Sequence, residues 1–337
     1  MKKNIFELLY GVLGLFIGFI TFWMIHIIYP DLYHDDTVVT AQWRPKNMET
    51  DLPKGAEGAI IKYGYLLITK TSNLIGPLAK DPAMQFAGNN LTCNNCHLNA
   101  GRKIGSGSFV GITNRFPQFR GRENKIGTME ERINGCMERS MSGIPIPEDS
   151  QEMKAMIAYM KWLSEGVPPD IEKQHKGYVK ITIPDFAADQ EKGEKLYQLH
   201  CQLCHMENGE GLQIPGKEFT GYLYPPLSGN DTYNDGAGMN RVLTAAQFIK
   251  GNMPFGVTHD APGVSDVEAY HLAAYINTFE RPNKPNRQAD FPDKSLKPVS
   301  TPYGPWVDEF SPEQHKFGPF PPIIEFYKKE YNLVKIK

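Results

Sequence analysis

The sequence has almost no net charge, because its 36 lysines and arginines nearly balance its 38 aspartates and glutamates, for a formal net charge of −2 at pH 7. This balance gives no support for binding nucleic acid through bulk charge. Cysteine is also scarce, with five in 337 residues. Four of the five form two closely spaced pairs, so Cys136 has no intramolecular partner for a disulfide.

Long apolar runs are scarce as well, but one lies near the N-terminus. Residues 8–29 form a stretch of 22 residues that contains no Asp, Glu, Lys or Arg. A hydrocarbon core needs about 20 such residues, whereas a signal peptide has a core of about 7 to 15 and a small-residue cleavage site, which is missing here. We therefore predict an uncleaved, single-pass anchor (1–30) in the cytoplasmic membrane. Lys2 and Lys3 stay in the cytoplasm, and the remainder of the chain lies in the periplasm.

Two short motifs carry the chemistry of the chain. Residues 93–97 read Cys-Asn-Asn-Cys-His, and residues 201–205 read Cys-Gln-Leu-Cys-His. In such a motif the thiols add to the vinyl groups of haem, and the adjacent histidine becomes an axial ligand of the iron. A zinc site would explain the cysteine pairs but not the histidine that follows each pair. We therefore predict two covalently bound haem c groups, held by Cys93, Cys96 and His97 and by Cys201, Cys204 and His205.

Helical periodicity flanks both motifs. In the first half it predicts helices over residues 57–74 and 151–163, and in the second half over residues 189–199 and 266–279. Each half therefore has a helix, a haem motif, a long loop and a closing helix, which is the cytochrome c plan. We predict a mainly α fold with two cytochrome c-like domains in tandem.

The domain boundaries follow from this repeat and from the composition between its parts. The second domain begins with the helix that leads into its haem motif, and Gly193 of that helix would let another helix approach closely. We expect the tail to pack its aromatic side chains, Tyr303, Trp306, Phe317 and Phe320, against a domain surface. The predicted segments are a membrane anchor (1–30), a tether (31–52), the first cytochrome c domain (53–168), a linker with a short strand over 178–183 (169–184), the second cytochrome c domain (185–282) and an irregular C-terminal extension with a short helix over 323–331 (283–337).

The second axial ligand of each iron decides between electron transfer and substrate chemistry. In the second half, Met253 lies in a Met-Pro pair ahead of the closing helix, 48 residues after His205. A small cytochrome c presents its thioether at such a place, so we favour Met253 as the ligand. Met239 is the competing candidate.

The first half has no Met-Pro pair in the matching loop and instead contains Cys136, 39 residues after His97. Met137 and Met141 are rival ligands, and an unpaired cysteine is commonly a small buried thiol. Nearby positive charge favours the ligating thiolate by lowering the thiol pKa. Five arginines lie within 25 residues of one another around Cys136: Arg115, Arg120, Arg122, Arg132 and Arg139. We favour Cys136 as the ligand, and an anionic, sulfur-containing substrate suits this setting.

Four stretches resemble dihaem thiosulfate dehydrogenases: residues 116–120, 131–141, 236–239 and 252–254. The resemblance covers residues 55–282, and the stretch around Cys136 is its most diagnostic part. It implies that two thiosulfates are coupled into tetrathionate with release of two electrons, and some family members run the reverse reaction. The anchor and the C-terminal extension depart from the soluble, secreted form of the family.

The resemblance also implies roles for individual residues. A haem ligated by His97 and Cys136 is the catalytic one, and a haem ligated by His205 and Met253 is the electron exit. Asn252 falls where some family members carry an alternative ligand. The substrate contacts that it implies are Arg122, Arg132 and Ser140.

Elementary electrostatics supports such a site, since thiosulfate is a dianion and arginines that neutralise two of them would lower the barrier to joining them. Ser140 could donate a hydrogen bond to a sulfonate oxygen. The Cys136 thiolate could be displaced from iron or could bond transiently to a substrate sulfur. The electrons then pass to a redox partner such as a soluble cytochrome c or a respiratory membrane complex.

Two other functions fit part of the sequence. A membrane-anchored dihaem electron relay without its own substrate explains the haems and the anchor, but it leaves Cys136 and the arginines without a role. A dihaem peroxidase needs an open haem with acid and base residues beside it, and the sequence shows no pattern of that kind.

Overall fold

The computed structural model describes residues 2–28 and 43–335, with the side chains of residues 2–9 left aside. The chain divides into two units, residues 1–44 and 45–337, and each is described separately. Part of the predicted tether (31–42) and the end of the predicted anchor lie outside the described residues.

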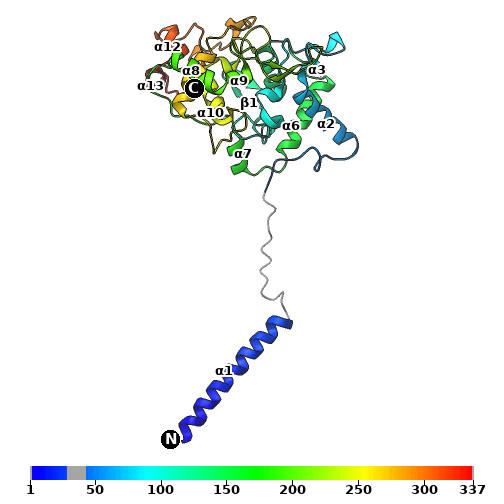
Figure 1. Cartoon of the computed structure of the whole chain (residues 1–337), viewed down its shortest axis with the longest axis vertical. Coiled ribbons are helices and arrows are strands. Elements are labelled where there is room, and N and C mark those ends of the chain that lie inside the picture. Colours follow the sequence, from blue (N-terminus) through cyan, green and yellow to red (C-terminus); the bar gives the residue numbers. More distant parts are fainter. Residues whose placement is uncertain (1, 29–42, 336–337) are drawn as a thin grey trace. The chain divides into compact units, whose positions relative to one another are not determined.

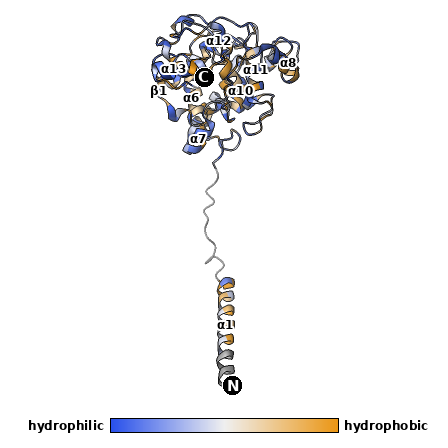
Figure 2. Ribbon diagram, turned by 90° about the vertical axis from the view of Figure 1, so that its left-hand side faces the viewer, coloured by the Kyte–Doolittle hydropathy of each residue, from blue (hydrophilic) through white to orange (hydrophobic). Residues whose placement is uncertain are grey.

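The first unit contains helix α1 (Lys2–Ile28). Its segment Tyr10–Ile28 has 19 residues, a mean hydropathy of 2.1 and no buried residue, and the ribbon in Figure 2 is coloured by hydropathy. At 1.5 Å per residue this segment is about 28 Å long, close to the thickness of a hydrocarbon core. The helix is therefore long and apolar enough to cross a membrane.

The second unit begins with the elements that surround the first haem motif. Their order is α2 (Gly55–Thr69), α3 (Thr71–Ile75), η2 (Pro82–Met84), η3 (Cys93–Asn95), α4 (Leu98–Gly101), η4 (Thr113–Arg115), β1 (Gln118–Arg120), β2 (Lys125–Gly127), α5 (Met129–Arg139) and α6 (Gln151–Ser164). Strands β1 and β2 form an antiparallel hairpin.

The elements around the second motif repeat this arrangement. They are α7 (Pro169–His175), α8 (Gln190–His200), α9 (Gln202–His205), β3 (Leu212–Gln213), β4 (Tyr222–Tyr224), η5 (Gly238–Asn240), α10 (Val242–Asn252) and α11 (Asp266–Ile276). In Figure 1, α2, α3 and α6 lie toward one side of this unit, and α8 and α10 lie toward the other.

A glycine brings the first and last helices of each half together. A Cβ atom on Gly64 of α2 would lie 2.0 Å from the carbonyl oxygen of Ala155 in α6. A Cβ atom on Gly193 of α8 would likewise lie 2.2 Å from the carbonyl oxygen of His271 in α11. Only glycine permits so close an approach of two backbones. The close approach predicted at Gly193 is therefore present, and both halves use the same device.

The C-terminal extension packs against the second half through regular elements of its own, η6 (Arg287–Ala289), η7 (Lys294–Leu296), α12 (Pro312–Phe317) and α13 (Pro321–Tyr331). Phe317 and Phe320 are buried in the same hydrophobic cluster as Tyr270 of α11, as predicted. Tyr303 and Trp306 are only half-buried. The extension therefore completes the core of the second half.

Several local predictions need correction. No strand forms over 178–183; Tyr178 makes a single bridge to Ser106, and one bridge cannot propagate a ladder. The helix predicted over 57–74 is interrupted at Lys70, whose backbone leaves the helical region. The linker predicted over 169–184 contains α7, which begins at Pro169 and has Pro168 as its N-cap.

One segment of the second half, residues 231–241, runs along the first half and joins the two. Asp231 accepts hydrogen bonds from the backbone and side chain of Asn90, and the Thr232 carbonyl accepts one from Asn89. Asn234 donates from its side chain to the Glu138 carbonyl at 2.8 Å, at the end of α5. We call residues 231–241 the seam segment. Because its contacts are specific hydrogen bonds, it holds the two halves in one arrangement.

Candidate haem and catalytic site

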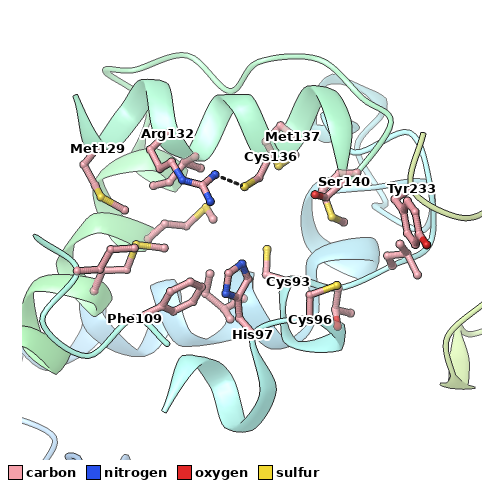
Figure 3. Close-up of a pocket in the computed structure, with 18 of the residues that line it drawn as sticks. Cys93, Cys96, His97, Phe109, Met129, Arg132, Cys136, Met137, Ser140 and Tyr233 are labelled. Atoms are coloured by element: carbon pink, nitrogen blue, oxygen red, sulfur yellow. Dashed lines mark hydrogen bonds between the residues drawn. The ribbon is translucent and has the colours of Figure 1, made fainter. Parts of the chain in front are cut away.

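The first haem motif opens into a cavity of about 760 Å³ (Figure 3). Cys93, Cys96 and His97 line one wall, and Cys136 on α5 projects into the cavity from the opposite wall. The remaining lining is mostly apolar and rich in methionine: Ile68, Leu91, Phe109, Ile112, Met129, Ile133, Met137, Met141, Met156, Met160 and Met239. An apolar wall of this kind excludes water from whatever the polar groups bind.

Helix α5 and its C-cap residue place three polar lining residues by helical spacing. Arg132, Cys136 and Ser140 are four residues apart, so they follow one face of the helix down into the cavity. The helix begins at a capping box in which Thr128 and Glu131 bond reciprocally to each other's backbone. Such a cap fixes the first turn and therefore the direction in which Arg132 points.

His97 is held in one orientation. Its Nδ1 lies 2.6 Å from the carbonyl oxygen of Gly107, which can only accept, so Nδ1 carries the proton and Nε2 is left for a metal. Phe109 packs against the imidazole with ring centroids 4.5 Å apart. Gly107 has φ of +65°, and a Cβ atom there would lie 3.3 Å from the imidazole ring. A glycine at this position therefore allows the backbone to reach the histidine.

Cys136 is set apart from the other thiols by Arg132, whose Nη1 donates to Sγ at 2.7 Å. Burial raises the Cys136 pKa, but the Arg132 charge, the nearby His97 side chain and the Arg139 charge bring the pKa down to about 5. By contrast, burial raises the pKa of Cys93 to about 11. Cys136 is therefore a thiolate at neutral pH, the form that binds metals and acts as a nucleophile.

The second haem motif faces another cavity, of about 700 Å³, lined among others by Cys201, His205 and Met253. Nδ1 of His205 donates to the Pro225 carbonyl at 2.8 Å, which again leaves Nε2 for a metal. Cys204 lies half-buried in the same motif.

Each alternative ligand considered for the second haem has a definite place. Asn252 is fully buried and donates from Nδ2 to the carbonyls of Gly105 and Phe248, each at 2.9 Å. Its amide therefore has backbone partners and is not among the residues that line this cavity. Met239 does line the cavity, as Met253 does. The geometry thus favours a methionine over Asn252 and leaves Met253 as our prediction.

The two cavities share a wall made of Leu91, Cys96, Tyr233 and Met239. Tyr233 and Met239 belong to the seam segment. Groups bound in the two cavities would therefore be separated by single side chains.

Of the five arginines around Cys136, Arg132 lines the first cavity, and Arg139 is buried close by. Arg120 binds Glu123 through two hydrogen bonds of 2.9 Å. Arg122 forms an ion pair with Asp290 of the C-terminal extension and donates to the Gly236 carbonyl at 3.2 Å. Sequence patterns did not reveal Asp290, because it lies 168 residues beyond Arg122.

The residues of both cavities fit haem c. Among residues 43–335 the cysteines form no disulfide, so those of both motifs can form thioether bonds. Each motif histidine has its Nδ1 bound to a carbonyl, so that Nε2 can face an iron. His97 and Cys136 would hold the iron in the first cavity, and His205 and Met253 would hold it in the second.

Two families match the two halves of the chain. The family described as SoxA/TsdA, cytochrome c domain, matches residues 84–168. The family described as cytochrome C oxidase, cbb3-type, subunit III, matches residues 188–276. The predicted fold, mainly α with two cytochrome c domains in tandem, is thereby confirmed, and haem c is the cofactor of such domains.

The chain is similar over most of its length to curated thiosulfate dehydrogenases. It is 38% identical to that of Stutzerimonas stutzeri over 237 residues, which cover 70% of this chain and 72% of the relative. It is 39% identical to that of Allochromatium vinosum over 236 residues, which cover 68% of this chain and 82% of the relative.

A solved structure has the same fold. The thiosulfate dehydrogenase TsdBA from Marichromatium purpuratum, in its "as isolated" form, superposes with a TM-score of 0.64 at 34% identity. The match covers 72% of this chain and 50% of that one, so this chain spans about half the length of the solved protein.

Proposed function

This chain belongs to the thiosulfate dehydrogenase family, and on that premise we propose that it joins two thiosulfate ions into one tetrathionate. The reaction forms one sulfur–sulfur bond between the two outer sulfurs and releases two electrons. No proton is exchanged, since both thiosulfate and tetrathionate are fully ionised. The same site can run the reverse reaction when the electron donor is reducing enough.

The observation that carries the proposal is the pairing of Arg132 with Cys136 in the wall opposite His97. Arg132 holds the thiolate and presents further N–H donors to an incoming anion. Ser140, on the same face of α5, can donate to a sulfonate oxygen. In a water-excluded site these contacts are stronger than in bulk water, so they offset the repulsion between two dianions.

We propose that the chain binds two haem c groups, one in each cavity. Haem c supplies at each site a one-electron acceptor, and two of them match the two electrons of the reaction. Cys93, Cys96 and His97 would hold the first together with Cys136, and Cys201, Cys204 and His205 would hold the second together with Met253. The shared wall of Tyr233 and Met239 keeps the two sites apart by one layer of side chains.

We assign Arg122 a weaker part in substrate binding than Arg132. Its guanidinium is already paired with Asp290 and bonded to the Gly236 carbonyl. A substrate anion would therefore meet a charge that is largely neutralised. Arg122 contributes chiefly by fixing the seam segment and the C-terminal extension beside the site.

We also propose the domain limits and the location of the chain. The catalytic domain is 53–168, the electron-transfer domain is 185–282, and helix α1 anchors both from the cytoplasmic membrane into the periplasm. The redox partner is then a soluble cytochrome c or a membrane complex. The apolar segment Tyr10–Ile28 supports the anchor.

The test is turnover by the purified, detergent-solubilised holoprotein. With thiosulfate and a one-electron acceptor such as ferricyanide, we expect one tetrathionate for every two acceptors reduced. A protein that exchanges electrons with the acceptor but forms no tetrathionate would instead be a dihaem relay.

A further inference from the structure

The first haem motif also forms part of the cavity at the second motif. Asn95 and Cys96 belong to the first motif, yet both line the second cavity, together with Leu91 of the same domain. In return, Tyr233 and Met239 of the seam segment line the first cavity. Each cavity is therefore completed by residues from the other half of the chain.

The amide of Asn95 is held in one orientation by Thr92. The side-chain oxygen, Oδ1, accepts hydrogen bonds from the Thr92 backbone N–H at 2.6 Å and from the Thr92 hydroxyl at 3.1 Å. A backbone N–H can only donate, so the amide atom that faces it must be the oxygen. The amide nitrogen, Nδ2, therefore lies on the side of the amide that is turned away from the Thr92 backbone.

Nδ2 of Asn95 is a donor without a partner in the part of the chain that the structure describes. It is not among the buried unpartnered atoms, so it keeps accessible surface. Thr92 lines the first cavity and not the second, whereas Asn95 lines the second and not the first. The oxygen end of the amide is thus turned toward the first cavity, and the nitrogen end is left to the second.

The second cavity is a setting in which one such donor has a large effect. Its walls include the apolar side chains of Leu227, Phe248, Ile249 and Ile276. The Nδ1 donor of His205 is already bonded to a backbone carbonyl. In apolar surroundings a hydrogen bond is electrostatically stronger than in water, and an unpaired polar group is costly. A donor at Asn95 therefore favours an acceptor bound in this cavity.

We infer that Asn95 donates a hydrogen bond from Nδ2 to the haem of the second cavity and thereby raises the reduction potential of that haem. This inference rests on the proposed function, which has one haem c in each cavity. The carboxylates of haem c are its anionic acceptors, and hydrogen bonds to an ionised acceptor are among the stronger ones. The same motif then attaches the first haem and tunes the second.

The sign of the effect follows from electrostatics. Reduction adds one electron to the iron, so the reduced haem is more negative by one charge than the oxidised haem. The positive end of an N–H dipole stabilises this added charge, and hydrogen bonds around a haem are among the determinants of its potential. The Cys136 thiolate at the first site and the Asn95 donor at the second therefore both favour electron flow from the first site to the second.

The test is a redox titration of the full-length, detergent-solubilised holoprotein, followed by absorption and electron paramagnetic resonance so that each potential is assigned to its haem. Asn95→Asp keeps an oxygen that accepts from Thr92 but replaces the Nδ2 donor with a second acceptor. Asn95→Ala removes the donor without adding a charge. The two middle positions of a Cys-x-x-Cys-His motif can vary, so both variants should keep both haems.

Asn94→Asp is the matched control. Asn94 is the neighbouring asparagine of the same motif and is also half-buried, but it lines neither cavity. Its Oδ1 accepts from the Ala100 backbone N–H at 2.7 Å, a bond that aspartate can also accept. The control therefore adds the same charge to the same motif without changing a group that faces the second cavity.

We expect Asn95→Ala to lower the potential of the second haem. The ratio of reduced to oxidised iron at a fixed applied potential should change about tenfold, which is about 59 mV for one electron. Asn95→Asp should lower this potential further, because it adds a negative charge. Asn94→Asp should move it clearly less than Asn95→Asp does, and both Asn95 variants should move the first potential less than the second.

A shift confined to the first haem, or equal shifts of the second potential in Asn95→Asp and Asn94→Asp, would show that Asn95 acts only within its own motif. The inference would then be wrong, and the proposed function would stand. If the Asn95 variants lose a haem, loss of the second supports the contact and loss of the first contradicts it. A wild-type protein with one haem per chain would overturn both the inference and the proposal of two haems.

Discussion

At the scale of single residues, Cys136 differs from the other four cysteines in its surroundings more than in its burial. The motif thiols are the predicted points of haem attachment, and burial raises the pKa of Cys93 and of Cys201. Cys136 instead accepts a 2.7 Å hydrogen bond from Arg132, and its pKa is lowered. A thiolate that is held in place by an arginine is suited to ligation or to sulfur chemistry, and a neutral buried thiol is not.

Replacing Cys136 with methionine should separate catalysis from electron transfer. In Cys136→Met both haems should remain attached, because attachment uses other cysteines. Loss of the thiolate should raise the potential of the first haem and reduce tetrathionate formation by at least about a hundred-fold. Redox titration and steady-state turnover measure the two effects. If turnover stays near normal, the chain is an electron relay and the catalytic assignment of Cys136 is wrong.

Replacement of Arg132 and of Arg122 by alanine should have different effects on kcat/KM and on stability. Arg132→Ala removes the partner of the thiolate and a substrate contact, so kcat/KM for thiosulfate should fall about ten- to a hundred-fold. Arg122→Ala should have a smaller effect on kcat/KM, because Asp290 already neutralises that charge. Arg122→Ala should lower thermal stability more than Arg132→Ala does. The buried carboxylate of Asp290 would lose Arg122 and keep Lys284, 3.4 Å away, as its ion-pair partner. Equal losses of kcat/KM in the two variants would contradict this ranking.

At the scale of elements, the sequence predicted best where its pattern was strongest. The helix expected over 151–163 is α6 (Gln151–Ser164), because its apolar residues recur regularly and Ser150 caps it. Helix α5 was not predicted, although it carries the catalytic candidates. Its eleven residues, Met129–Arg139, include five charged side chains, so its apolar face is narrow. The sequence signal for its start is the capping box of Thr128 and Glu131. A search for apolar periodicity does not detect this local pattern.

The close helix–helix approach at Gly64 can be tested by a single substitution. Gly64→Ala places a Cβ atom against the backbone of Ala155, which cannot move without shifting α6. We expect a loss of about 1 to 3 kcal/mol in the free energy of unfolding, as for other overpacked cores. Thermal or denaturant unfolding of the holoprotein measures it.

Gly216→Ala is the control for this variant, because the nearest atom to its Cβ position, 3.6 Å away, is at ordinary contact distance. A Gly64→Ala protein as stable as Gly216→Ala would mean that α2 and α6 are farther apart than described.

At the scale of the whole molecule, contacts distant in sequence decide how the parts form one site. Local motifs predicted two haem domains because covalent attachment needs a fixed spacing of residues. They did not predict that the seam segment would supply a wall to both cavities, or that Asp290 would bind Arg122. The C-terminal extension was expected to be irregular because Pro and Gly interrupt it, yet its aromatic side chains are spaced to enter the second core. Pairings between such distant residues leave no periodic trace in one sequence.

The N-terminal helix should determine where the molecule is found. The apolar segment Tyr10–Ile28 is long enough to span a bilayer, and no cleavage site follows it in the sequence. The native protein should therefore remain in the membrane fraction after a high-salt wash and be released by detergent, with mass spectrometry showing an intact N-terminus. Replacing residues 1–30 with a cleavable signal peptide should yield a soluble protein with the same haem content and the same thiosulfate turnover. This exchange keeps export to the compartment where haem is attached, so a loss of haem would not be confused with a loss of anchoring. A native protein that is soluble and begins near residue 30 would show that the helix is a signal sequence and not an anchor.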